Sequence, residues 1–275
     1  MPGTDIDTMP TRRAVDNTDW LKTIAIILVS VDHFGYFFIE DNQWWDVIGR
    51  LAAPVFFYLL GYAQTRKVPV SWLWLALMLT IMDSWNNDWT WVAPNILFSL
   101  ALIRLARPYV QILLQRYGWV AFVLLVSTLF AMLPITADVV EYGSEGWMWA
   151  LFGLCQRRYV DTRPLPGASQ KPTAQKTNRN PGLMRLLACL IATGVCIWQE
   201  QLEYSFSEIQ FAALVFGMGM LSIGLCLFLR GPSRFQPPSP LAIGLRYIGR
   251  RTLEIYAIQL AGFEIIINLL PDLAA

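Results

Sequence analysis

The sequence is poor in charge, in histidine and in cysteine. Charged residues make up 15% of its 275 residues, whereas an average soluble domain has about 25%. The four cysteines form no CxxC pair, and no group of cysteine and histidine residues has metal-site spacing. We therefore interpret the cysteines as small buried hydrophobic residues and expect no metal. The net charge of +1 does not point to an acidic partner, and we expect no nucleic acid to bind.

What the sequence does have is long apolar runs, because 55% of its residues are hydrophobic. A helix needs roughly 20 such residues to cross a bilayer. Nine runs meet or approach that length, at about residues 21–39, 48–65, 68–82, 91–105, 119–137, 146–154 plus a turn, 183–198, 209–229 and 252–270. The first run lacks a small-residue cleavage site, so we expect it to stay in the mature protein. The predicted fold is an all-α, polytopic membrane helical bundle with about nine transmembrane helices in the lipid bilayer.

The loops between these runs alternate in charge. Basic residues precede the first run and follow the even-numbered runs, and acidic residues follow the odd-numbered runs. Cytoplasmic loops are enriched in Lys and Arg, so the N-terminus is predicted to be cytoplasmic and the C-terminus periplasmic. Residues 1–18 are predicted to form a cytoplasmic tail, and residues 19–275 a single domain. A stretch rich in proline, lysine and glutamine at about 161–181 is predicted to be a flexible cytoplasmic loop.

The single histidine, His33, lies inside the first apolar run. An ionisable side chain within the hydrocarbon is a functional hypothesis, and histidine can act as a general base near neutral pH. The alternative is a structural histidine bonded to a neighbouring helix. Lys22 lies eleven residues earlier and therefore projects from the same helical face. It could hold an anionic group, or it could be a lysine that snorkels at a helix end.

Other charged residues lie at or inside the ends of the runs. Arg50 is the basic residue that breaks the alternation on the outer side, which suggests either an ion pair with Asp32 or a substrate role. Glu264 matches the predicted depth of His33 and could contact and orient the imidazole. Four arginines near helix ends either anchor the topology or bind a phosphorylated cosubstrate, and these are Arg157, Arg158, Arg250 and Arg251.

Several sequence blocks together resemble the TraX-like family. The first block has an LK-x-IA start and a DH-x-G end, with Asp32, His33 and Gly35 in the second part. The second block is GR-x-A-x-P-x-F, beginning at Gly49 and Arg50. Shorter blocks resemble later parts of the family pattern, at residues 94–98, 141–143 and 249–258.

The resemblance implies a cellular location, an activity and a set of partners. TraX-like proteins are associated with N-terminal acetylation of pilin, and they are similar to the transmembrane acyltransferases of acyltransferase family three. That set carries a basic residue, ten intervening residues and a histidine in its first helix, as Lys22 and His33 do. The resemblance therefore implies an acetyl-CoA-dependent acyltransferase in the bacterial inner membrane. The implied acceptor is a hydroxyl or amine of a pilin, an envelope polysaccharide or a glycan, and the protein could work in an envelope-assembly complex or homo-oligomer.

The resemblance also implies roles for individual residues. His33 is the implied catalytic base with Asp32 beside it, and Lys22 and the four helix-end arginines are the implied acyl-CoA ligands. The implied substrate-binding residues are Arg50, Asn95, Tyr142, Gln259 and Glu264.

One residue departs from the pattern. Many relatives have a histidine after the IYA-x motif of the last helix, where this chain has Gln259. Glutamine can form hydrogen bonds but cannot shuttle a proton, so two other functions stay open. One is a membrane transporter or permease, although the sequence has no internal inverted repeat. The other is a non-catalytic subunit of an envelope-assembly complex.

Overall fold

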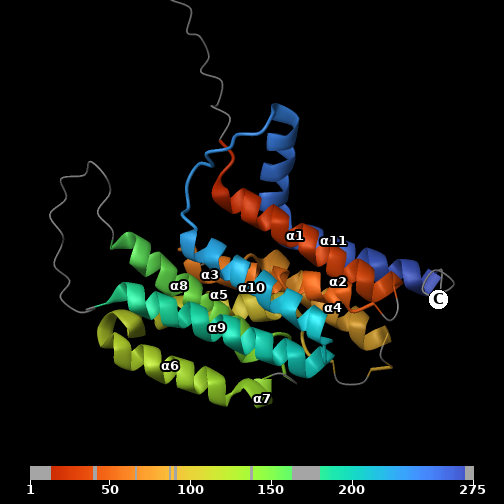
Figure 1. Cartoon of the computed structure of the whole chain (residues 1–275). Helices are drawn as coiled ribbons and strands as arrows, with labels where there is room; N and C mark the ends of the chain where they lie inside the picture. The colour runs from red at the N-terminus through yellow and green to blue at the C-terminus, as the bar shows by residue number, and fades with distance from the viewer. Residues whose placement is uncertain are drawn as a thin grey trace, which may run out of the picture.

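The computed structural model describes residues 14–39, 42–65, 67–86, 88–89, 92–136, 139–162 and 180–269, and most of them are helical (Figure 1). The described residues contain no strand, only an isolated bridge between Asp16 and Pro232. The helices are α1 (Asn17–Phe38), α2 (Trp44–Gly49), α3 (Ala52–Tyr62), α4 (Val70–Asn86), α5 (Ile96–Tyr117), α6 (Trp119–Ala131), α7 (Leu133–Thr136), α8 (Gly143–Asp161), α9 (Pro181–Tyr204), α10 (Glu208–Leu227) and α11 (Ser239–Leu269). The predicted all-α fold is confirmed.

Each of the nine predicted runs coincides with one or two of these helices. Five helices, α1, α5, α9, α10 and α11, are long and apolar enough to cross a membrane, and α4 and α6 are shorter apolar helices. The protein therefore has the character of a multi-helix membrane protein, and the count of nine spans stays a prediction. Most of the predicted loop, at residues 163–179, and most of the predicted tail, at residues 1–13, lie outside the described residues.

The last helix is longer than its predicted span. It begins at Ser239, thirteen residues before the predicted start at 252, and it contains a kink at Arg251 with φ −111° and ψ 22°. The hydroxyl of Thr252 donates a hydrogen bond to the backbone carbonyl of Ile248 at 2.7 Å, so this carbonyl keeps a partner at the bend. The first half of α11 is more polar, and the second half is the apolar segment that the sequence predicted.

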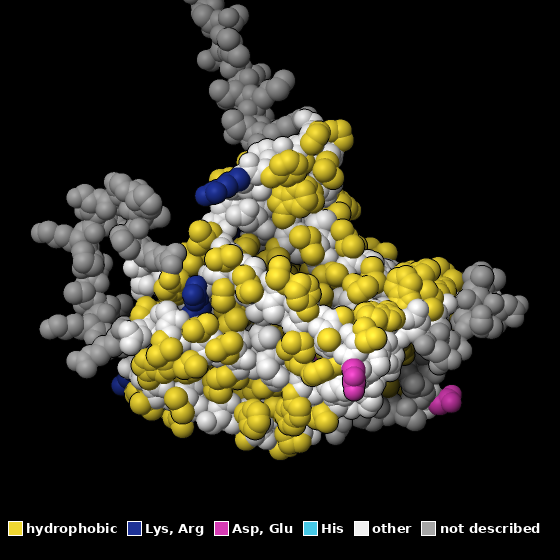
Figure 2. All heavy atoms as spheres, in the orientation of Figure 1, with side chains coloured by type: hydrophobic (Ala, Val, Ile, Leu, Met, Phe, Trp, Pro, Cys, Tyr) yellow, Lys and Arg dark blue, Asp and Glu magenta, His cyan; other side chains and the backbone are white. Residues whose placement is uncertain are grey.

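The surface is unusually apolar. Many large hydrophobic side chains are more than one third exposed, among them Phe216 at 72% and Leu227 at 74%. Figure 2 shows hydrophobic side chains spread over the visible face, with basic groups toward its left end and acidic groups toward its right end. Water would disfavour such an extensive apolar surface, and a bilayer accommodates it. The separation of charge in this view agrees with the alternation of the loops.

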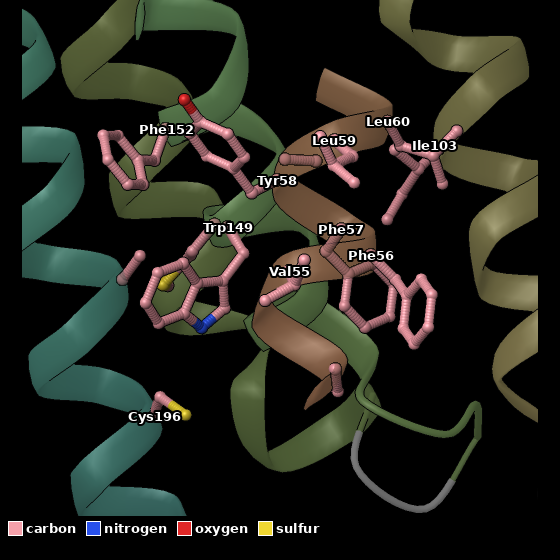
Figure 3. Close-up of a cluster of buried hydrophobic side chains, with 14 of the residues drawn as sticks. Val55, Phe56, Phe57, Tyr58, Leu59, Leu60, Ile103, Trp149, Phe152 and Cys196 are labelled. Atoms are coloured by element: carbon pink, nitrogen blue, oxygen red, sulfur yellow. The ribbon is translucent and has the colours of Figure 1, made fainter. Parts of the chain in front are cut away.

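The centre of the bundle is the short helix α3. All eleven of its residues are buried, and they pack against α8 (Figure 3). A Cβ added at Gly61 would collide with the backbone of Ala150, and one at Gly153 would collide with the carbonyl of Tyr58. Small residues let two backbones approach closely, which is the main way that helices associate in lipid. These glycines therefore set the close contact between α3 and α8.

Helices α1 and α11 lie side by side along much of their length (Figure 1). Asp16 begins α1 with a capping box, in which Asp19 supplies the reciprocal hydrogen bond. A Cβ at Gly249 would collide with Asp19, so the glycine allows the start of α1 to approach α11. Further along, Phe37 contacts Phe263, so α1 and the second half of α11 run in the same direction. The predicted first and ninth spans require this direction.

Candidate active site

The imidazole of His33 lies between α1 and α11. Its ring centroid is 5.4 Å from that of Tyr256 on α11 and 6.5 Å from that of Phe37 on its own helix. Its Nδ1 is buried and has no hydrogen-bond partner in the described part of the chain. A buried nitrogen that forms no hydrogen bond is costly, because protein interiors normally satisfy such atoms. His33 is thus not a structural histidine bonded through Nδ1 to a neighbouring described helix.

A second buried polar atom without a partner among the described residues lies one turn away, also between α1 and α11. The Ser30 hydroxyl donates to Gln259 Oε1 at 2.9 Å, which ties α1 to α11. The Nε2 of Gln259 is buried and finds no acceptor among the described residues. Gln259 therefore presents an amide donor that has no partner in the described part of the chain. The contact between α1 and α11 thus contains a ring nitrogen of His33 and an amide donor of Gln259, neither of which has a hydrogen-bond partner among the described residues.

Asp32 and Arg50 form the ion pair that the sequence suggested. Arg50 Nη2 donates to both carboxylate oxygens of Asp32 at 2.8 Å. A Cβ at Gly49 would collide with the Asp32 side chain, so the glycine before Arg50 makes room for the pair. The guanidinium also lies over the ring of Tyr204 at 5.2 Å and interacts electrostatically with Tyr142. The two most specific sequence blocks therefore meet in space, next to His33.

A basic cavity opens near the other end of α1. It has a volume of about 370 Å³ and is bordered by α1, α3, α4, α5 and α11. Four cations line it, namely Lys22, Arg104, Arg230 and Arg250, against one carboxylate, Glu254. Lys22 Nζ donates to Gly249 O at 2.8 Å, which leaves further ammonium hydrogens for a ligand. Such a cavity can bind an anion.

Arg104 is the cation of this cavity that sequence reasoning missed most clearly. Its guanidinium lies 4.6 Å from the ring centroid of Trp72, and within the described ranges its Nε has no hydrogen-bond partner. The signal was present, because an arginine inside an apolar run is itself unusual. Arg230 had no comparable signal, since it follows α10 in a segment that the basic loops already explained.

The other predicted phosphate ligands are separated by the fold. Lys22 and Arg250 line the cavity, but Arg157, Arg158 and Arg251 are not among its lining residues. Arg157 forms an ion pair with Asp161 at 3.0 Å, one helical turn away. Arg251 is exposed at the kink of α11. These three arginines stay predictions without support from the cavity.

Two predicted substrate residues have structural partners. The Asn95 side chain accepts from Leu97 N at 3.1 Å as the cap of α5, and its Nδ2 donates to Ala76 O at 2.8 Å. Tyr142 has a left-handed backbone with φ 62° and packs its ring 5.6 Å from that of Phe57. Asn95 thus connects α4 to α5, and its amide is already occupied on both sides.

The loop before α8 also holds a carboxyl group at the start of α5. Ile96 N donates to Glu141 Oε2 at 2.6 Å. Burial raises the pKa of Glu141 to about 7, in spite of this hydrogen bond and of the nearby charge of Arg50, which both act in the opposite direction.

Glu264 lies further along α11 than the predicted contact with His33 requires. It is buried, and its neighbour Phe263 contacts Phe37 and Phe38, about one turn beyond His33. The ring facing the imidazole is that of Tyr256, eight residues before Glu264. The predicted contact between Glu264 and His33 therefore stays a prediction.

Comparison with known proteins places these features in a family. The family described as "TraX protein" matches residues 17–162, which is more than half of the chain. This part contains Lys22, Asp32, His33, Arg50 and Arg104 but not Tyr256 or Gln259.

The chain is also similar to individual curated proteins. Protein TraX of Escherichia coli is 27% identical over 134 residues, which is 46% of this chain and 51% of that protein. The chain therefore aligns with about half the length of that relative. An uncharacterized protein of Rickettsia prowazekii is 22% identical over 250 residues, or 88% of each chain. No solved structure matches. On the match over residues 17–162, the chain belongs to the TraX family.

Proposed function

We propose that this TraX-family protein is a membrane-embedded acetyltransferase of the bacterial inner membrane. It moves an acetyl group from cytoplasmic acetyl-CoA to a hydroxyl or amine of a pilin, an envelope polysaccharide or a glycan. The observation that carries the proposal is His33. It has a buried Nδ1 with no partner among the described residues, it adjoins the Asp32–Arg50 pair, and it shares a helical face with Lys22 at the basic cavity.

The cavity is suited to the phosphates of coenzyme A. Its four lining cations exceed its one carboxylate, and arginine binds phosphate oxygens in a bidentate geometry. The lining also includes Thr252 and Leu253, which lie one turn before Tyr256, the residue that contacts His33. Lys22 and His33 are eleven residues apart, or about 16 Å along the helix. An extended pantetheine arm spans such a distance, so phosphates at Lys22 allow a thioester near His33.

The chemistry is a direct acyl transfer. His33 removes the proton from the acceptor hydroxyl or amine, whose oxygen or nitrogen then attacks the thioester carbonyl carbon. The carbon–sulfur bond breaks, and the protonated imidazole returns a proton to the departing coenzyme A thiolate. In this mechanism the Nε2 of Gln259, which lies on the same face of α11 as Tyr256, donates to a carbonyl oxygen or to the acceptor. A binding role of this kind needs no proton shuttle at position 259.

The direct test is acetyl transfer by purified protein in lipid nanodiscs with labelled acetyl-CoA. We expect His33→Ala to lower turnover by about 10²–10⁴-fold, the usual contribution of a general base. The matched control is Tyr36→Phe, because Tyr36 lies on the same helix and is 78% exposed. Turnover by His33→Ala at the wild-type rate would reject the mechanism. Acetylated His33 trapped during turnover would replace direct transfer by an acyl-histidine intermediate.

The same preparation separates the two rival functions. A transporter would carry substrate across proteoliposomes without consuming acetyl-CoA. A non-catalytic subunit would bind acetyl-CoA or the acceptor without turning over. Either result with wild-type protein would contradict the acetyltransferase proposal.

A further inference from the structure

Three metal-ligating side chains meet between α8 and α9, outside the site described above. They are Glu145 in the first turn of α8, and Cys196 and Glu200 four residues apart on α9. One carboxylate oxygen of each glutamate and the sulfur of Cys196 all lie within 4.8 Å of one another. Figure 3 shows Cys196 extending from α9 toward the side of α8 that carries Trp149.

These groups are deeply buried, and one of their carboxylate oxygens has no hydrogen-bond partner among the described residues. Glu145, Cys196 and Glu200 are 8%, 1% and 4% exposed. The Oε2 of Glu200 is buried and accepts no hydrogen bond from any described residue. Neither glutamate forms a salt bridge within the described part of the chain, because Arg50, which interacts electrostatically with both, is paired with Asp32. Two buried carboxyl groups without a bonded cation are costly unless protons or a metal ion neutralise them.

We infer that Glu145, Cys196 and Glu200 bind a divalent transition-metal ion, for which zinc is the best match. Thiolate and carboxylate are both zinc ligands, whereas magnesium and calcium prefer oxygen ligands alone. Ligand atoms around a tetrahedral zinc lie about 3.3–3.8 Å apart, given bond lengths of about 2.0–2.3 Å. The three ligand atoms lie within 4.8 Å of one another, so the inference requires small side-chain rotations to bring them into that range. Three protein ligands leave a fourth position for water or a polar group.

The charge balance agrees with the position of Arg50. Two carboxylates and one thiolate carry three negative charges, and a divalent ion leaves one of them uncompensated. Arg50, which interacts electrostatically with Glu145 and Glu200, faces that remaining charge. A metal at this place would hold α8 against α9. Its existence does not depend on acetyl transfer.

The test is metal binding by the purified full-length chain in detergent, without acetyl-CoA. After treatment with a chelator and addition of Zn²⁺, we expect one zinc per chain to survive gel filtration, measured by elemental analysis. With Co²⁺ instead, we expect a near-ultraviolet thiolate-to-cobalt absorption band. Cys196→Ser should lose the band, and Glu200→Gln should lose the retained metal. Cys155→Ser should keep both, because Cys155 is equally buried but is not part of the group.

Each outcome decides the inference. Wild-type protein that retains no zinc and gives no cobalt band would overturn it, as would a band that persists in Cys196→Ser. If Cys196→Ser does not fold, as judged by gel filtration and circular dichroism, the conservative Glu200→Gln variant decides instead. Loss of metal by this variant supports the inference, and retention of metal overturns it. Acetyl transfer is measured separately with His33→Ala, so failure of one proposal is distinguishable from failure of the other.

Discussion

At the scale of single residues, the candidate site depends on glycines as much as on charged groups. Gly49 has no Cβ where the Asp32 side chain lies, and Gly35 has none where Trp45 lies. Both glycines belong to the sequence blocks that identified the family. They allow α1 and α2 to approach closely enough for Arg50 to reach Asp32. Each of the two motifs thus contains a charged residue and a glycine, and the glycine makes room for a side chain of the neighbouring helix.

Gly49→Ala should therefore damage the site without removing any charged group. The added Cβ would collide with Asp32 and displace it from Arg50, so we expect a loss of stability of about 1–3 kcal/mol, typical of overpacking. Acetyl transfer should fall as well. Thermal unfolding in detergent measures the first effect. The control is Gly194→Ala, because no described atom lies within 4 Å of a Cβ there, and equal effects of the two changes would contradict the packing argument.

Glu141 should give the protein a pH-dependent stability. Its ordinary pKa is 4.5 and burial raises the pKa to about 7 in the folded state. The folded state thus favours the protonated form, so this contribution is fully present below pH 4.5 and is lost as the pH rises through about 7. Glu141→Gln keeps an acceptor for Ile96 N but cannot ionise.

The measurement is the melting temperature of wild type and Glu141→Gln between pH 4.5 and 8. We expect the wild type to lose stability relative to the variant as the pH rises through this interval. A difference between the two proteins that stays constant with pH would show that Glu141 does not titrate there.

At the scale of helices, the basic cavity is formed by elements distant in sequence. Lys22 comes from α1, Arg104 from α5, Arg230 from the segment after α10 and Arg250 from α11. Each of the four cations therefore comes from a different segment of the chain. Only the packing of α1 against α11, and of both near α5, makes the charges converge on one volume.

Arg104→Ala should weaken acetyl-CoA binding with little effect on the chemical step. Loss of one phosphate contact removes a charge-assisted hydrogen bond, which is worth about 1.5–3 kcal/mol, or roughly 10–150-fold in Kd. Titration calorimetry in nanodiscs measures the Kd, and single-turnover kinetics measures the transfer step. Arg234→Ala makes the same charge change at an exposed residue outside the cavity lining. Equal weakening by both variants would indicate only a general loss of positive charge.

At the scale of the whole molecule, the exposed apolar surface and the parallel direction of α1 and α11 agree with a membrane bundle that has an odd number of spans. Five described helices are long and apolar enough to cross a bilayer. The shorter helices α3, α4 and α6 would need support from their neighbours. For α3 this support is evident, because all eleven of its residues are buried in protein and none faces lipid.

The predicted topology places the two ends of the chain on opposite sides of the membrane. A phosphatase fused after Ala275 should be active, because this reporter works only in the periplasm, and the same reporter inserted at residue 170 should be inactive. A cytoplasmic reporter should give the reverse pattern at both positions. Cytoplasmic activity after Ala275 would contradict the nine-span topology.

The sequence alone determined the helices and the face that joins Lys22 to His33. Both follow from local periodicity, since apolar length sets a span and 3.6 residues per turn sets a face. The Asp32–Arg50 pair was also accessible, because an arginine among the acidic loops of the predicted topology suggests a carboxylate partner. The structural role of Asn95 was not accessible from the sequence, because its amide caps α5 and also donates to α4; its role toward substrate stays a prediction.

Only the tertiary structure decided which helices meet and at which register. It brought Arg104 and Arg230 to Lys22, and it separated Arg157, Arg158 and Arg251 from that cavity. It also assembled Glu145, Cys196 and Glu200 from two helices, where the spacing of cysteines and histidines had suggested no metal. The physical reason is that contact between helices depends on close packing at a few small residues and on kinks such as that at Arg251. A shift of one turn, about 5.4 Å, exchanges one set of neighbours for another without changing any local pattern.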